Sequence, residues 1–299
     1  NTDDAVNYVG TSDDHRLIFK VNGQASGQID NTNGNTAFGF LSHRSNKPIG
    51  SSSFGYSAGQ NFDLGDDYNT AIGGNSMASA AGYGATNNTA IGFSSMGLML
   101  NGTYNTALGS SSLPGMTFGN ENIAIGHDAM RYADNTSYNT AVGGASLSEL
   151  TTGLNNTALG YCSLRSNTIG NHNTAVGNIT FANLTTGSNN TGLGYNAGNA
   201  VDTASDITAI GYNTLKLSTD YGSDTAVGSS VMTVATGGSL NVAVGYASLN
   251  SLTGGLFLAN SNTAIGYSAG SSQNAAYQNT KIGYAAGTSG VSSQSTSMG

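Results

Sequence analysis

The chain has 299 residues, of which 44 are glycine and only 2 are proline, 8% of its residues are charged, and its formal net charge is −8. So little proline excludes collagen, and the low charge excludes the usual kind of disordered chain. Eight basic residues, scattered and outnumbered by sixteen acidic ones, argue against a nucleic-acid partner. No apolar run is long enough to span a membrane and no stretch resembles a signal peptide, so we expect no membrane insertion.

Residues 1–34 lack the repeat that fills the rest of the chain, and we expect them to form a β-rich leader or connector. Residues 16–21 alternate apolar and polar side chains, which is typical of a half-buried strand. The pairs Asn22-Gly23 and Asn33-Gly34 are strong turn signals.

A five-residue motif, best seen at Asn139-Thr-Ala-Val-Gly143, recurs through residues 35–287, and from Gly92 to Gly245 its closing glycine returns every 17 residues. A fixed period of this length predicts a solenoid. Strong helix formers are scarce and the unit is too short for a βαβ crossover, so we expect an all-β parallel β-roll of about 15 coils. Each coil would hold one strand at the motif and a second three to eight residues after the glycine. Residues 288–299 are predicted to be a flexible Ser/Gly-rich tail or a link to a missing C-terminal part.

The two-residue side-chain period of a strand assigns the motif to two faces. The threonine shares a face with the apolar residue before the glycine, and the alanine shares the other face with the glycine. We expect the apolar residue to enter the interior, opposite the Leu or Met four residues after the glycine. The alanines would then point outward.

A row of outward alanines lets another backbone approach closely, which predicts a seam between subunits; crowding at the turn is the alternative explanation. The seam would comprise Ala71, Ala90, Ala107, Ala124, Ala141, Ala158, Ala175, Ala209, Ala226, Ala243 and Ala264. Lys281 interrupts this row only in the last coil.

The asparagine that opens the motif predicts a ladder of stacked side-chain amides, each donating to the coil above and accepting from the coil below. Such a ladder satisfies the polar groups of the turns without charge. Its members would be Asn69, Asn88, Asn105, Asn122, Asn139, Asn156, Asn173 and Asn190.

The residue after the glycine is often aromatic and forms a second candidate surface. Stacked rings at this position could bind glycan through their faces, or they could simply pack along the coil edge. The candidate glycan-contact residues are Tyr161, Tyr195, Tyr212, Tyr246, Tyr267 and Tyr284.

The motif has a familiar form. Asn-Thr-Ala-Ile-Gly, at 69–73, 88–92 and 262–266, resembles the Asn-Ser-Val-Ala-Ile-Gly repeat of YadA-like heads in trimeric autotransporter adhesins. The resemblance covers about residues 35–287 and implies a left-handed parallel β-roll, three identical chains side by side, and binding to host surface molecules. The leader at 16–30 resembles a segment of phage tail fibres and related virion spikes, which are also homotrimers with similar repeats.

No pattern typical of catalysis, metal binding or cofactor binding is visible. The aspartates near His15 match no metal-ligand spacing, and the glutamates Glu121 and Glu149 occupy different coil positions, unlike a glycosidase pair. Cys162 is alone, so no intrachain disulfide forms. We therefore expect neither an enzyme nor a cofactor.

Three functions remain open. The first is a structural, receptor-binding segment of a virion tail fibre or spike, which assembles as a homotrimer and presents a face for a host-surface glycan or protein. The second is the head or passenger of a trimeric adhesin on a bacterial surface. The third is a monomeric ice-binding solenoid that uses regular threonine and asparagine rows. The mass in solution separates the third from the others, and flanking sequence separates the first two.

Overall fold

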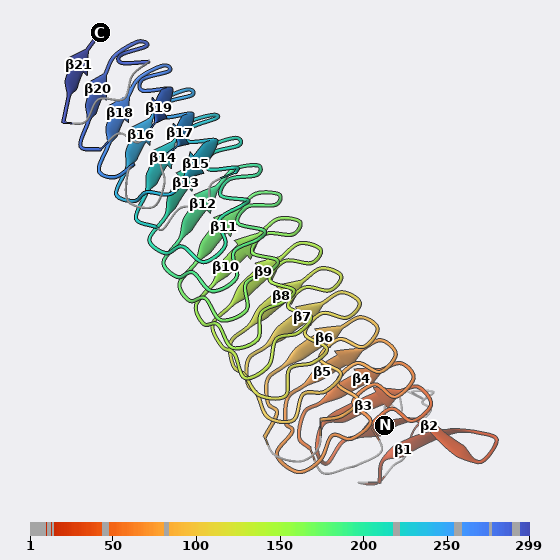
Figure 1. Ribbon diagram of the computed structural model, residues 1–299. Helices are drawn as coiled ribbons and strands as arrows, with labels where there is room; N and C mark the ends of the chain where they lie inside the picture. Colours follow the sequence, from red (N-terminus) through yellow and green to blue (C-terminus); the bar gives the residue numbers. More distant parts are fainter. Residues whose placement is uncertain are drawn as a thin grey trace, which may run out of the picture. The chain divides into compact units, whose positions relative to one another are not determined.

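The computed structural model describes residues 10, 13, 15–43, 48–80, 84–217, 222–253, 259–274, 277–288 and 294–299. The chain divides into two compact units, Asn1–Phe118 and Gly119–Gly299, which we call the N-terminal and C-terminal units. Across these described ranges all regular secondary structure is β-strand (Figure 1).

The N-terminal unit begins with antiparallel strands and continues with parallel ones. β1 (Leu17–Val21) pairs with β2 (Gln24–Asp30), and β2 pairs with β3 (Asn35–Phe38), both antiparallel. The parallel series β3, β4 (Ser52–Phe54), β5 (Thr70–Ile72), β6 (Thr89–Ile91) and β7 (Thr106–Leu108) then follows, with equivalent motif positions in register. The β1–β2 hairpin therefore covers the starting edge of the parallel sheet, an edge that would otherwise be open to other chains.

The C-terminal unit is built from the same coil. Its parallel strands are β8 (Ile123–Ile125), β9 (Thr140–Val142), β10 (Thr157–Leu159), β11 (Thr174–Val176), β12 (Thr191–Leu193), β13 (Thr208–Ile210), β14 (Thr225–Val227), β16 (Val242–Val244), β18 (Thr263–Ile265), β20 (Thr280–Ile282) and β21 (Thr296–Met298). The predicted all-β parallel solenoid with a 17-residue period is thus confirmed.

Two details differ from the sequence prediction. A second parallel sheet forms only late in the chain, from β15 (Val234–Thr236), β17 (Ser251–Thr253) and β19 (Ser272–Asn274); in most other described coils turns and bends occupy this segment. In addition, β21 lies within the stretch predicted to be a flexible tail, yet it pairs with β20 in the regular register.

The alanines of the motif point into the solenoid and not away from it. All eleven have no exposed surface: Ala71, Ala90, Ala107, Ala124, Ala141, Ala158, Ala175, Ala209, Ala226, Ala243 and Ala264. The apolar residue of the motif faces outward instead, so that Leu159 is 37% exposed. The prediction of an alanine seam between subunits is therefore wrong, because these side chains fill the chain's own interior.

Large interior side chains come from the residues four and seven positions after the glycine. Leu147, Leu150 and Leu164 are fully buried there beside the small alanines. The closely packed interior tolerates little change of volume. Where Phe181 takes the large position, the next coil has Gly192 in place of alanine, because a Cβ at this residue would lie 2.6 Å from the Phe181 ring.

The asparagines form an amide ladder inside each unit, which Ser51 interrupts in the N-terminal unit and Ile207 and Asp224 interrupt in the C-terminal unit. In the C-terminal unit the backbone N–H of Asn156 donates to Oδ1 of Asn139 (2.9 Å), and its side-chain Nδ2 donates to the same atom (3.1 Å). Nδ2 also donates to the turn carbonyl of Gly170 (2.8 Å) in the following coil. Every such bond between asparagines runs from the later coil to the earlier one, so the ladder has a direction.

The closing glycine is required by both backbone conformation and space. Gly160 has φ +134°, and a Cβ on it would lie 2.3 Å from the carbonyl oxygen of Gly177 in the next coil. Three further positions of the same coil adopt left-handed φ without glycine, as at Asn155, Cys162 and Leu164 (57°, 53° and 48°). Left-handed residues therefore recur at fixed places in the coil and turn the chain back on itself.

Candidate binding surface

Three rows of side chains face outward from the sheet of the C-terminal unit. The threonine row holds Thr140, Thr157, Thr174, Thr191, Thr208, Thr225, Thr263 and Thr280. The aliphatic row holds Val142, Leu159, Val176, Leu193, Ile210, Val227, Val244, Ile265 and Ile282. The tyrosine row, on the other side of the closing glycine, holds Tyr161, Tyr195, Tyr212, Tyr246, Tyr267 and Tyr284.

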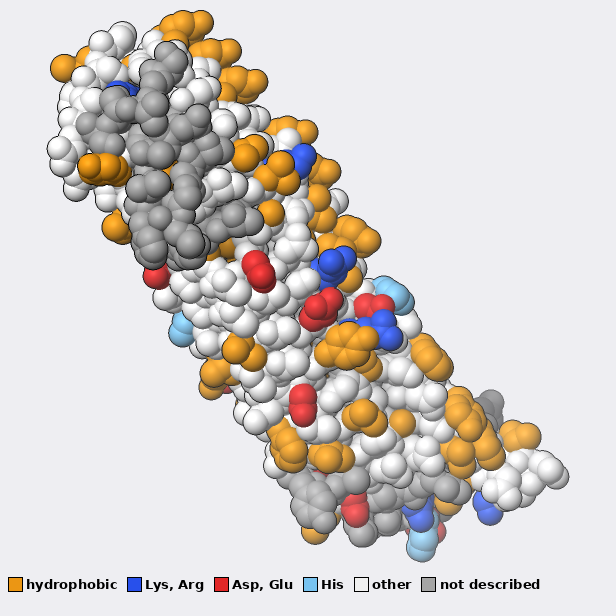
Figure 2. Space-filling view, in the orientation of Figure 1, with side chains coloured by type: hydrophobic (Ala, Val, Ile, Leu, Met, Phe, Trp, Pro, Cys, Tyr) orange, Lys and Arg blue, Asp and Glu red, His pale blue; other side chains and the backbone are white. Residues whose placement is uncertain are grey.

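The aliphatic row is a substantial apolar surface. Leu193, Ile265 and Ile282 are 48%, 42% and 41% exposed. In Figure 2 hydrophobic side chains line one margin of this unit, with basic and acidic side chains interspersed among them. Contiguous apolar surfaces of this kind are rare on monomers and usually mark an interface.

The rings of the tyrosine row stack on one another between coils. The centroids of Tyr195 and Tyr212 are 5.6 Å apart, those of Tyr246 and Tyr267 are 5.2 Å apart, and those of Tyr267 and Tyr284 are 5.1 Å apart, with interplanar angles of 15°, 15° and 8°. Both faces of Tyr267 are therefore covered by its neighbours. Glycan cannot stack on such a ring, so part of the row serves packing.

The row is interrupted where the residue after the glycine carries no ring. Ser229 stands between Tyr212 and Tyr246, and Asn178 stands between Tyr161 and Tyr195. Tyr212 stacks on the ring of the preceding coil and Tyr246 on that of the following coil, which leaves the opposite face of each ring directed toward Ser229. We call the space between these two faces the ring slot.

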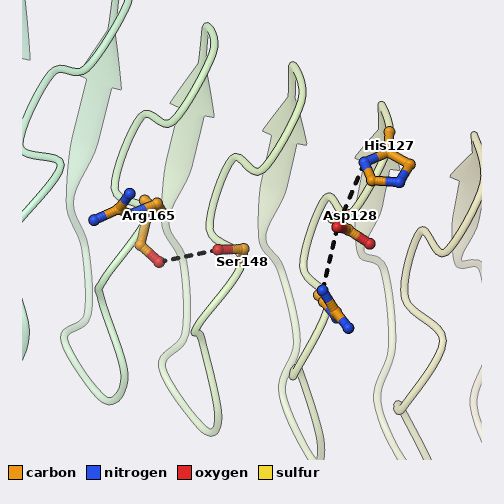
Figure 3. A network of polar contacts seen from close by, with 5 residues as sticks. His127, Asp128, Ser148 and Arg165 are labelled. Atoms are coloured by element: carbon orange, nitrogen blue, oxygen red, sulfur yellow. Dashed lines mark hydrogen bonds and ion pairs between the residues drawn. The ribbon is translucent and has the colours of Figure 1, made fainter.

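The tyrosine row carries little charge. A side-chain hydrogen bond with Cys162 raises the pKa of Tyr161 above its usual range. His127 takes the same coil position and contacts Asp128 (Nδ1–Oδ2, 3.4 Å), which also accepts from Arg131 (3.3 Å; Figure 3). Exposed ion pairs of this kind add little stability.

The remaining histidines are separated from one another. His15 contacts Asp13 at 3.1 Å on the surface, while Asp3, Asp4 and Asp14 lie outside the described residues. His172 is exposed in a turn. Among the residues that the structure describes, no group of three potential metal ligands comes together.

His43 is a buried exception in the N-terminal unit. It occupies the interior position that Met or Leu fills in other coils, is 1% exposed, and packs edge-on against Phe62 with ring centroids 5.6 Å apart. Burial lowers its pKa to about 4, against the opposing effect of the Asp30 carboxylate. The ring is therefore neutral at physiological pH, as a core side chain.

A cavity of about 190 Å³ lies between the β1–β2 hairpin and the first coil, where Gln28, Ser42 and His43 form part of its wall. Its one cationic side chain, Arg16, already donates to Oε1 of Gln28 (3.3 Å). Ser42 Oγ donates to the Gly39 carbonyl (2.8 Å) and neither ring nitrogen of His43 has a hydrogen-bond partner among the described residues, so the two are not paired as nucleophile and base, and we assign no chemistry to the cavity.

Comparisons with known proteins found no matching family model, no similar curated protein and no similar solved structure. The part of the chain that the structure describes contains no helix long and apolar enough to cross a membrane. The surface geometry is therefore the basis for a functional proposal.

The aliphatic row is the surface feature that the sequence interpretation missed. Its side chains were expected inside, yet the sequence held a signal for the opposite choice. The asparagine shares a face with the alanine, and an amide that must reach the turn carbonyls of a neighbouring coil has to lie inside. The alanine follows it inward, and the aliphatic residue is left outside.

Proposed function

We propose that this chain is a structural segment of a homotrimeric fibre, in which the aliphatic rows of three copies cover one another. The observation that carries the proposal is the unbroken outward row of Val, Leu and Ile on a sheet with little charge. Covering it would remove apolar area from water at about 25 cal/mol per Å². Three copies and a left-handed winding are what the resemblance to trimeric adhesin heads and virion fibres implies.

The tyrosine row lies beyond the closing glycine, at the margin of this interface. It remains available to a ligand, and we propose that it forms the face presented to a host-surface glycan. The site of action is the virion tail fibre or spike; the alternative is the head of a bacterial surface adhesin. Neither role requires catalysis, a metal or a cofactor.

Light scattering on the purified chain tests the assembly. We expect a mass three times that of the 30.0 kDa chain. Leu193→Glu, which places a charge in the aliphatic row, should shift the mass toward that of a single chain. Ile169→Glu is the matched control, because Ile169 is 51% exposed but lies outside the strands. A single-chain mass for the unaltered protein would contradict the proposal.

The outward threonine row favours a second candidate, ice binding. Thr140, Thr157 and Thr174 stand in register on successive parallel strands beside the aliphatic row, which gives a regular array of hydroxyl and methyl groups. The asparagines are buried and take no part in this array. A single-chain mass together with thermal hysteresis would favour this candidate over the fibre.

A further inference from the structure

We propose that the ring slot between Tyr212 and Tyr246 binds a single neutral sugar ring, the terminal residue of a glycan. This inference deepens the proposed function, since it names the place and the ligand class of the glycan-binding face. It depends on Ser229, which supplies no ring between Tyr212 and Tyr246, each the end member of a stack.

The coil spacing sets the size of the slot. Parallel strands are ~4.8 Å apart, so rings separated by two coils are roughly 10 Å apart. One ring inserted midway would lie about 5 Å from each tyrosine, within the range of favourable ring contacts. This is also the spacing of the stacked pairs in the same row, 5.1 Å to 5.6 Å. The slot therefore has room for one ring, because Ser229 stands where a further tyrosine would complete a regular stack.

The orientation of the Tyr212 and Tyr246 rings favours the terminal sugar of a glycan over an internal one. Tyr212 and Tyr246 stand in one row on either side of Ser229, and the two residues are 55% and 52% exposed. A ring must therefore enter edge-on from solvent, with the rest of the glycan extending away from the surface. An internal residue of a chain lying along the row would meet Tyr195 or Tyr267, whose stacked neighbours block such a course.

The surroundings favour a neutral, hydroxyl-rich ligand. The coil of Tyr212 carries one described cation, Lys216, and between Gly222 and Thr253 the only charged residue is Asp224, which is buried. Two tyrosine hydroxyls and the hydroxyl of Ser229 supply polar groups beside two apolar ring faces. A pyranose has the matching character, with C–H groups on its faces and hydroxyls at its rim. An aromatic side chain from a partner protein would fill the space but leave these polar groups unused.

Ligand-observed saturation-transfer NMR tests the site, with the methyl glycosides of galactose, glucose, mannose and N-acetylglucosamine as probes. At least one should give transfer to its ring protons. Ser229→Tyr supplies the missing ring and should weaken binding about tenfold or more, since two ring contacts are lost. Gly144→Tyr is the matched control: it adds the same side chain to the same row but leaves the slot open, and should bind like the unaltered chain.

A gain-of-binding variant keeps the test independent of damage to the fold. Tyr267→Ser should create a second slot, between Tyr246 and Tyr284, and raise the number of bound probe molecules. Absence of transfer from all four probes, or equal binding by Ser229→Tyr and Gly144→Tyr, would overturn the proposal, as would displacement of a probe by free phenol but by no sugar. The mass of the same samples separates the two proposals: a trimer without sugar binding rejects only the slot, and a sugar-binding single chain rejects only the fibre.

Discussion

At the scale of single residues, glycine and the buried amide determine the coil more than hydrophobicity does. At the closing glycine any side chain would collide with backbone of the next coil, as at Gly160, and the same holds at the turn glycines Gly153 and Gly170. The sequence shows the position of the closing glycine through its invariance within the repeat. It does not show which face of the strand is interior, since alanine and valine are both apolar enough to be buried.

Substitution of Gly160 by alanine should therefore be severe. Strain at a φ that favours glycine and a collision with the carbonyl oxygen of Gly177 together should lower the free energy of unfolding by roughly 3 kcal/mol or more. Urea unfolding followed by circular dichroism measures the loss. Gly144→Ala is the control, because a Cβ there would lie 3.5 Å from the nearest atom of Tyr161 and 3.9 Å from the His127 carbonyl oxygen, which are ordinary contacts. Equal effects of the two changes would refute the argument.

His43 should make the N-terminal unit sensitive to acid. Its folded-state pKa of about 4 lies below the ordinary value of 6.5, so between these two pH values His43 is protonated in the unfolded chain but neutral in the folded chain. Above pH 6.5 the free energy of unfolding has its full value. As the pH falls from 6.5 toward 4, protonation of His43 in the unfolded chain lowers this free energy by on the order of 3 kcal/mol. His43→Met, which copies Met77 at the equivalent position, should reduce the difference between urea midpoints at pH 7.5 and 4.5. An undiminished difference would assign the acid sensitivity to other groups.

At the scale of the coil, the period, the parallel pairing and the buried Leu and Met four residues after the glycine could all be predicted from the sequence. The second strand could not. Most coils fold this segment as turns held by side-chain bonds, such as Ser146 Oγ to the Gly143 carbonyl (2.9 Å). The composition of the segment varies between coils, and only a stack of extended neighbours, β15 with β17 and β19, makes a ladder there.

The side-chain volumes at facing interior positions of adjacent coils should also depend on one another. Gly192→Ala inserts a methyl group beside Phe181 and should destabilise the fold by about 1–3 kcal/mol. In combination with Phe181→Leu, which frees space, the same change should cost much less. A double-mutant cycle by urea unfolding measures this coupling. Additive effects would show that Gly192 is needed for a reason other than the size of Phe181.

At the scale of the whole molecule, the correction of the faces changes what holds copies together. An alanine seam would have brought backbones into close contact, whereas the aliphatic row offers larger side chains and more apolar area. The candidate tyrosines are exposed, and the stacking expected from their recurrence covers both faces of Tyr267, so the row leaves a ligand its interruptions, at Ser229 and at Asn178.

If three chains cover one another, thermal stability should depend on protein concentration. Each tenfold dilution lowers the free energy by about 1.4 kcal/mol per association step, which corresponds to a shift of several degrees in the unfolding midpoint. Scanning calorimetry at three concentrations, at a slow scan rate, measures the shift. The Leu193→Glu variant should show a midpoint that no longer varies. A constant midpoint for the unaltered chain would indicate that each solenoid is stable alone.

The one-way amide ladder has a consequence for biosynthesis. Asn139, Asn156, Asn173 and Asn190 each donate to the Oδ1 atom of the ladder asparagine 17 residues earlier. As the C-terminal unit leaves the ribosome, the Oδ1 acceptor for the ladder asparagine of each new coil is already present in the coil made before it. The same side chain also donates forward, as Asn156 Nδ2 does to the Gly170 carbonyl (2.8 Å), so the bonds of each asparagine are complete only once the following coil has been made.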